Sequence, residues 1–162
     1  MDRLWSPWRY RYIAASETAP DRPACVFCSK LLAGDDRAAL IVHRARHNAV
    51  ILNLYPYTSG HLMVVPYAHV PTLEACPAEV LSELILLAQQ AEARLRAEYR
   101  CEGLNIGFNI GASAGAGVAG HLHLHLVPRW TGDANFMTTV GETRVLPEEL
   151  PDTYRRLSGG WT

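Results

Sequence analysis

The stretch "GHLHLHLVPRW", residues 120–130, places three of the chain's seven histidines at every second position of an apolar run. Successive side chains of a β-strand point to opposite faces, so His121, His123 and His125 would share one face and the intervening leucines the other. The leucine face can be buried against a helix. The histidine face would then be a row of imidazoles about 6–7 Å apart, from two strand rises. A lone strand histidine is usually a satisfied packing residue, but three in register indicate a functional site.

The rest of the chain predicts short strands around one long helix. Residues 76–100 have apolar residues every three or four positions, with Pro77 suited to the first turn, and this pattern predicts an amphipathic helix. Apolar, β-branched runs predict strands at 38–43, 49–54, 61–66 and 104–110, besides the histidine strand. We therefore expect an α+β domain with a mainly antiparallel sheet of about five strands and one long helix.

Length and composition favour a single globular domain over residues 1–162. Of the 162 residues 49% are hydrophobic and 19% charged, which is too apolar for a disordered chain. The net charge of -1 gives no global attraction for nucleic acid or an anionic membrane. The head "MDRLWSPWRYRYI" lacks the apolar core of a signal peptide, and no segment reaches membrane-spanning length. We expect a cytoplasmic protein that binds neither nucleic acid nor membrane.

The histidine row suits two chemistries. Imidazole ligates metals, and it also acts as a nucleophile and proton carrier near neutral pH. The loop "GASAGAGVAG", residues 111–120, runs into the row, and its glycines would let backbone N–H groups cradle an anion such as phosphate. A plain flexible connection is the alternative interpretation of this loop. It does not fit a dinucleotide-binding fingerprint, because it lacks the G-x-G-x-x-G spacing and a following helix.

Cys25 and Cys28 form a Cys-x-x-Cys pair, which in a reducing compartment binds metal or does redox chemistry more often than it forms a structural disulfide. A redox motif needs a preceding strand, and "APDRPA", residues 19–24, is a poor strand. Metal binding is therefore favoured. We interpret Cys76 and Cys101 as small packing residues. The tryptophans Trp5, Trp8 and Trp130 are also interpreted as packing residues, and His43 and His47 as ordinary surface or strand-edge histidines.

The segment "HLHLHLV", residues 121–127, resembles the H-φ-H-φ-H-φ-φ signature of the histidine triad (HIT) superfamily of nucleotide hydrolases and transferases. The resemblance covers roughly residues 4–140 and is closest to the bacterial branch that contains the diadenosine tetraphosphate phosphorylases. The segments that carry it are "LWSPWRYRYI" (4–13), "CVFC" (25–28), "NLYPYTSGHLMVVPYAHV" (53–70), "NIGASAGAGVAG" (109–120) and "PRWTGDANF" (128–136). It implies a HIT-like fold, in which a shorter helix accompanies the sheet and the long helix.

The resemblance implies a catalytic role for three histidines. His123 would attack the α-phosphorus of a dinucleoside polyphosphate and form a covalent nucleotidyl-histidine, which phosphate or water then resolves. A backbone carbonyl would orient its ring. His125 would contact the phosphate and assist the leaving group, and His61 would reach the same pocket from the neighbouring strand. A surface strand-end residue is the alternative interpretation of His61.

The resemblance also implies a substrate-binding set. Asn53 would lie near the ribose, Asn109 would hydrogen-bond phosphate oxygens, and Gly117 and Val118 would donate their main-chain N–H groups to the phosphate. Either asparagine could instead cap a turn.

The metal set implied by the resemblance is Cys25, Cys28, His69 and His121, a closed Cys₂His₂ arrangement that suits structural zinc. Magnesium or manganese would accompany the polyphosphate substrate. HIT proteins are commonly two-fold dimers, so a homodimer is expected.

Phosphate is the favoured acceptor of the nucleotidyl group. The alternatives are hydrolysis of dinucleoside polyphosphates or nucleoside phosphoramidates, and a nucleotide-binding signalling module. A zinc-organised nucleic-acid binder is disfavoured by the net charge.

Overall fold

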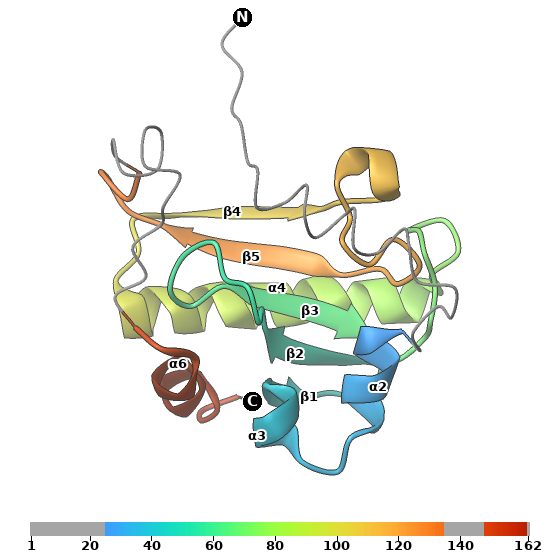
Figure 1. The fold of residues 1–162 in the computed structure, drawn as a ribbon, viewed down its shortest axis with the longest axis horizontal. Coiled ribbons are helices and arrows are strands. Elements are labelled where there is room, and N and C mark those ends of the chain that lie inside the picture. Colours follow the sequence, from blue (N-terminus) through green and yellow to red (C-terminus); the bar gives the residue numbers. More distant parts are fainter. Residues whose placement is uncertain (1–24, 135–147, 162) are drawn as a thin grey trace, which may run out of the picture.

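A five-stranded antiparallel sheet forms the centre of the fold (Figure 1). The computed structural model describes residues 25–134 and 148–161. The strands lie in the order β1-β2-β3-β5-β4, and each adjacent pair is antiparallel. Their bounds are β1 Ile41–Arg44, β2 Asn48–Leu52, β3 Leu62–Pro66, β4 Gly103–Phe108 and β5 Leu124–Arg129. The predicted fold class is confirmed.

The predicted long helix is α4, Ala78–Tyr99, which lies behind the sheet in Figure 1. Pro77 is its N-cap, and Arg100 ends it in the left-handed conformation with φ 49°. Its buried residues recur every three or four positions: Val80, Leu84, Leu87, Ala88, Ala91 and Leu95. Leu124 and Leu126 of β5 share a core cluster with Leu84 and Leu87, so the leucine face of the histidine stretch packs on α4 as predicted.

Two short helices, α2 (Val26–Leu32) and α3 (Asp36–Ala39), cover the opposite face of the sheet. Alternate residues of β2 show this division, because Val50 belongs to the cluster with α4 whereas Ile51 belongs to the cluster with Phe27 and Leu31 of α2. With α6 (Leu150–Leu157), the described residues contain three short α-helices, against the one expected. Each has no more than eight residues, which is too short for a clear helical periodicity in the sequence.

The strand predicted over residues 38–43 begins later, at Ile41. Ala38 and Ala39 instead belong to α3, since the Asp35 carboxylate accepts a hydrogen bond from the Ala38 N–H at 3.0 Å and caps that helix. Leu40 then ends it in the left-handed conformation with φ 65°. The capping residue was present in the sequence, but the apolar run that follows it favoured a strand.

The paired strand β5 begins at Leu124, so only His125 of the three histidines lies within it. β3 pairs with β5 no further than Val64 opposite Leu124, and β4 ends at Phe108 opposite the same residue. Upstream of this point the Leu122 N–H donates instead to the Val70 carbonyl at 2.7 Å. The predicted strand is therefore too long at its N-terminal end, although the alternation of side chains continues.

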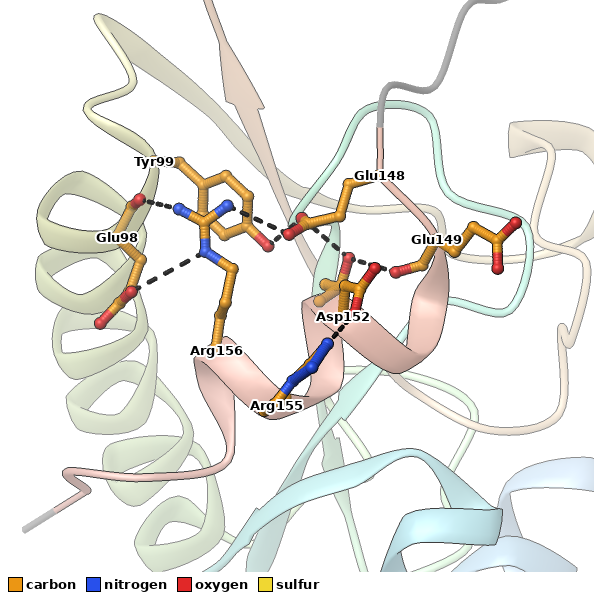
Figure 2. Close-up of polar contacts among 8 residues, drawn as sticks. Glu98, Tyr99, Glu148, Glu149, Asp152, Arg155 and Arg156 are labelled. Atoms are coloured by element: carbon orange, nitrogen blue, oxygen red, sulfur yellow. Dashed lines mark hydrogen bonds and ion pairs between the residues drawn. The ribbon is translucent and has the colours of Figure 1, made fainter.

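The C-terminal helix α6 is attached to the end of α4 by a polar network (Figure 2). The Glu148 carboxylate accepts hydrogen bonds from the Tyr99 hydroxyl at 2.6 Å and the Thr153 hydroxyl at 3.1 Å. Arg156 pairs with the same carboxylate at 3.0 Å, and its guanidinium carbon lies 4.2 Å from the centroid of the Tyr99 ring. Burial and the neighbouring carboxylate raise the pKa of Tyr99, so this phenol stays protonated and donates. No prediction was made for this part of the chain.

The interpretation of Cys76 and Cys101 as packing residues is confirmed, because both are buried. Trp130 packs against the main core cluster and donates its indole N–H to the Tyr99 carbonyl at 3.3 Å. Trp5, Trp8 and the segment "APDRPA" (19–24) lie outside the described residues, as do residues 135–147. Among the helices that are described, none has the length and apolar content needed to cross a membrane. The cytoplasmic location stays a prediction.

Candidate active site and metal cluster

His123 is a buried histidine whose ring orientation is set by its own backbone. Its Nδ1 lies 2.8 Å from the carbonyl oxygen of His121. A carbonyl can only accept, so Nδ1 carries the proton and Nε2 carries the lone pair. His123 is 5% exposed, and this burial lowers its pKa below the ordinary histidine value, which favours the neutral ring. The ring is therefore oriented by a backbone carbonyl, as expected from the resemblance. A nucleophilic role, which stays a prediction, would use Nε2.

His61 and His125 form a hydrogen-bonded pair beside His123. His61 Nε2 lies 3.0 Å from His125 Nδ1, and the His123 and His125 ring centroids are 4.8 Å apart. That separation of ring centroids is shorter than the 6–7 Å spacing expected from two strand rises. His61 lies directly before β3 and is 1% exposed, so the surface interpretation of this residue is wrong.

A backbone donor determines which ring nitrogen carries the proton in each histidine of this pair. The Tyr57 N–H donates to His61 Nδ1 at 3.1 Å, which makes Nδ1 an acceptor and places the His61 proton on Nε2. That proton is donated to His125 Nδ1, so a neutral His125 carries its own proton on Nε2. His125 can therefore donate a hydrogen bond from Nε2 to an oxygen of a bound phosphate.

Phe27 is one of the residues near the histidines that the sequence analysis missed. Its ring centroid lies 5.4 Å from that of His121 and 4.9 Å from that of His123. It comes from "CVFC", between the two cysteines, and is 5% exposed. The signal in the sequence was an aromatic residue inside the metal-binding motif, but nothing there showed that it would reach the histidine strand.

Asn53 lies beside His61, where it already has local partners. Its Oδ1 accepts from the Tyr55 N–H at 2.9 Å, which is the turn-capping role considered as an alternative, and its Nδ2 lies 3.4 Å from His61 Nδ1. Contact with the ribose stays a prediction for this residue.

The remaining predicted substrate contacts lie on the segment that leads into the histidines. Asn109 directly follows β4, whose last residue Phe108 pairs with Leu124, so Asn109 lies at the end of the sheet where His123 lies. Gly117 and Val118 are in the turn before His121, and the His121 N–H donates to the Val118 carbonyl at 3.3 Å. The Val118 side chain packs against the cluster that contains Phe27. The phosphate-binding roles of these three residues stay predictions.

The four predicted metal ligands come together in one cluster. Their ligand atoms, from Cys25, Cys28, His69 and His121, all lie within 4.8 Å of one another. The Cys25 Sγ and the Cys28 Sγ lie 3.3 Å and 3.5 Å from His121 Nδ1, and the Cys28 Sγ lies 3.3 Å from His69 Nδ1. All four residues are in loops or at the start of a helix, yet their ligand atoms meet at one point.

The donor set fits a tetrahedral ion such as zinc. Zinc bonds of about 2.3 Å to sulfur and 2.0–2.1 Å to nitrogen give sulfur-to-nitrogen edges of about 3.6 Å in a tetrahedron. The observed separations of 3.3–3.5 Å are close to this value. His121 Nε2 also lies 2.9 Å from the Pro66 carbonyl, which fixes the ring with Nδ1 toward the cluster. Within the described ranges, no second group of three or more His, Cys, Asp or Glu ligands is found that would hold magnesium or manganese.

Comparison with known proteins agrees with this geometry. A HIT domain model matches residues 36–132. The chain is 42% identical to the AP-4-A phosphorylase of Mycobacterium tuberculosis over 166 aligned positions, which cover 99% of this chain and 85% of that protein. Among solved structures, a zinc-bound histidine triad family protein from Mycobacterium smegmatis is 27% identical, with a TM-score of 0.65 over 83% of this chain and 91% of that one. A hypothetical histidine triad nucleotide-binding protein from Sulfolobus tokodaii is 30% identical, with a TM-score of 0.63 over 83% and 87%.

Proposed function

The chain belongs to the histidine triad family, and on this premise we propose that it is a nucleotidyl transferase that cleaves diadenosine tetraphosphate at the α-phosphorus and passes the adenylyl group to phosphate. The observation that carries the proposal is the His123 ring, buried and held by the His121 carbonyl with its unprotonated Nε2 as the nucleophile. The likeness over nearly the whole chain to the AP-4-A phosphorylase of M. tuberculosis supports the substrate and the acceptor.

In the first step His123 Nε2 attacks the α-phosphorus. A phosphorus–nitrogen bond forms, the bond from phosphorus to the bridging oxygen breaks, and ATP leaves with the bonding electron pair. The His123 Nδ1–H keeps its hydrogen bond to the His121 carbonyl. This hydrogen bond stabilises the positive charge that develops on the ring. His125, held by His61, donates its Nε2–H to a phosphate oxygen as negative charge builds up there.

In the second step an oxygen of inorganic phosphate attacks the same phosphorus and displaces His123, which gives ADP. Water in place of phosphate would give AMP. Asn109 and the N–H groups of Gly117 and Val118 would bind phosphate oxygens, and Asn53 would lie at the ribose. Magnesium or manganese would arrive with the polyphosphate, whose oxygens supply most of its ligands.

Zinc is the metal that we propose for the Cys25, Cys28, His69 and His121 cluster. Four protein ligands leave no open position, so the ion would have a structural role. It would hold the start of α2 and the loop after β3 against the residue that orients His123. The zinc-bound relative from M. smegmatis supports this choice.

A homodimer of a single-domain chain, residues 1–162, completes the proposal. β4 is at the edge of the described sheet, and its residues 105–107 are exposed, with Ile106 at 46%. Ile85 and Leu86 of α4 are also exposed, at 58% and 59%. Apolar side chains on an edge strand and a helix are candidates for burial by a second copy. Analytical ultracentrifugation of the protein and of Ile106→Asp tests this, with a shift to monomer expected in the variant.

The function is tested by incubating the full chain with diadenosine tetraphosphate, with and without inorganic phosphate, and separating the products. ADP plus ATP that appear only with phosphate support the proposal. AMP plus ATP in both reactions would instead identify a hydrolase. If neither reaction gives product, the chain acts on another substrate, such as a nucleoside phosphoramidate, or binds nucleotide without turnover.

A further inference from the structure

The metal-binding motif also carries the residue that packs on the nucleophile. We propose that Phe27 is a positioning residue for His123, which braces the imidazole so that its Nε2 is held in line with the reacting phosphorus. This inference rests on the proposed nucleotidyl transfer through His123. It assigns a second task to "CVFC", besides holding a metal ion.

Phe27 is firmly held, which a positioning residue requires. It is 5% exposed and belongs to a buried cluster with Leu31 of α2, Ile51 of β2 and Met63 of β3. A side chain packed on three elements has little freedom to move when a neighbouring ring presses on it. Its ring lies 4.9 Å from the His123 centroid at an angle of 46°.

The hydrogen bond to the His121 carbonyl does not by itself fix His123. It restrains Nδ1, but the ring can still pivot by small combined rotations about its Cα–Cβ and Cβ–Cγ bonds while the hydrogen bond is kept, and such a pivot would move Nε2. The ring centroids of Phe27 and His125 lie 4.9 Å and 4.8 Å from that of His123. Together these contacts limit the pivot. Because attack on phosphorus needs in-line geometry, a displacement of Nε2 by about 1 Å can slow the reaction by about 10²-fold.

The position of Phe27 in the motif links this bracing to the metal cluster. Cys25 is the N-cap of α2 and Cys28 lies in its first turn, and both thiols approach His121 Nδ1. The same turn places the Phe27 ring beside both histidines, with its centroid 5.4 Å from that of His121 and 4.9 Å from that of His123. One turn of helix therefore holds both the residue that orients the nucleophile and the nucleophile itself.

The test compares Phe27→Ala and Phe27→Leu with Leu31→Ala. Leu31 is a matched control, since it lies on the same helix and in the same cluster but has no ring contact with the histidines. We expect Phe27→Ala to lower kcat about 10- to 100-fold with KM changed less than about 3-fold, and bound metal to stay at the wild-type ratio. Phe27→Leu should recover part of kcat, because it refills most of the space. Leu31→Ala should lower the melting temperature with kcat within about 2-fold of wild type.

An equal loss of kcat in Leu31→Ala and Phe27→Ala would overturn the proposal, as would a change confined to KM or a loss that follows metal content. A second readout needs no substrate. In protein labelled with ¹⁵N-histidine, wild-type His123 should give one set of sharp ring signals with protonated Nδ1. Phe27→Ala should broaden or divide them, and Phe27→Leu should do so less. Unchanged signals in both variants would contradict the bracing even if the chain does not cleave diadenosine tetraphosphate.

Discussion

The imidazoles of His61 and His125 are joined by a hydrogen bond of 3.0 Å, and the Tyr57 N–H fixes its direction by donating to the far side of His61. His61 directly precedes β3 and His125 lies in β5, and these two strands are adjacent in the sheet. Since a backbone amide cannot become an acceptor, His61 always presents Nε2–H to its partner while this contact holds. His125 is thereby kept with its own proton on Nε2, as a donor toward the proposed position of the substrate.

Replacing His61 should therefore impair His125. In His61→Ala the Nδ1 of His125 loses its donor, so the ring can take either tautomer and no longer presents Nε2–H reliably. We expect kcat to fall about 10- to 100-fold, which is at or below the lower limit of the roughly 10²- to 10⁴-fold that a positioned proton donor contributes, because His125 itself is still present. His61→Gln, whose amide N–H can donate to His125, should lose less. Steady-state kinetics with diadenosine tetraphosphate measures both, and equal losses in the two variants would contradict the role of the hydrogen bond.

Removal of the nucleophile should abolish covalent catalysis but leave binding. His123→Ala lacks the nitrogen that forms the bond to phosphorus, so we expect turnover to fall by about 10⁴-fold or more. Nucleotide affinity should change less than about 5-fold, because the proposed contacts of the ribose and phosphates lie elsewhere. Acid-quenched mass spectrometry should detect an adduct of one adenylyl group on wild type and none on the variant. His43→Ala, which removes a histidine stacked on Trp161 outside the site, is the control.

The parts of the site that the sequence predicted are those that depend on local alternation and motif spacing. The period-two pattern of residues 121–126 correctly divided the leucines from the histidines. The family resemblance correctly grouped Cys25 and Cys28 with His69 and His121, as their ligand atoms show. Both inferences need only strand geometry or a family pattern.

The parts that were missed depend on packing between distant segments. The contact of Phe27 with His123 arises because α2 lies on the face of the sheet opposite α4, and no periodicity in seven helical residues could show this. The amide of Tyr57 acts through its backbone, which carries no signal in the residue type. The late start of β5, at Leu124, follows from where its pairing with β3 and β4 stops, at Val64 and Phe108, which the sequence of a single strand does not contain.

The hairpin between β1 and β2 is held to α4 by a carboxylate, which gives a pH dependence of stability. Burial alone would raise the pKa of Glu83, but hydrogen bonds from the Asn48 side chain at 2.8 Å and the backbone N–H groups of His47 and Arg46 outweigh it and lower the pKa. A carboxyl group whose pKa is lower in the folded state stabilises the fold above its unfolded pKa. That contribution is lost as the pH falls through the folded value.

Glu83→Gln should therefore be less stable than wild type at pH 7, by about 1–2 kcal/mol for a charge-assisted hydrogen-bond set at a half-buried site. The difference should shrink as the pH is lowered below the ordinary glutamate range, because the wild-type side chain then becomes neutral too. Urea unfolding at several pH values measures it. Glu79→Gln, an exposed residue in the first turn of the same helix, should show a much smaller change. A difference that is constant with pH would contradict the assignment.

Metal removal should loosen the N-terminal side of the site before it unfolds the sheet. The cluster joins α2 and the loop after β3 to His121, whereas the main core with α4 contains none of the four ligands. Chelation should therefore lower the melting temperature, since a metal that binds only the folded state stabilises it by mass action, and activity should fall with metal content. Cys28→Ala should lose the metal, while Cys101→Ala, which also removes a thiol but from the core with α4, should retain it at reduced stability. If Cys28→Ala keeps one metal ion per chain by elemental analysis, or if chelated protein keeps full activity, the proposed link from the cluster through His121 to the nucleophile is wrong.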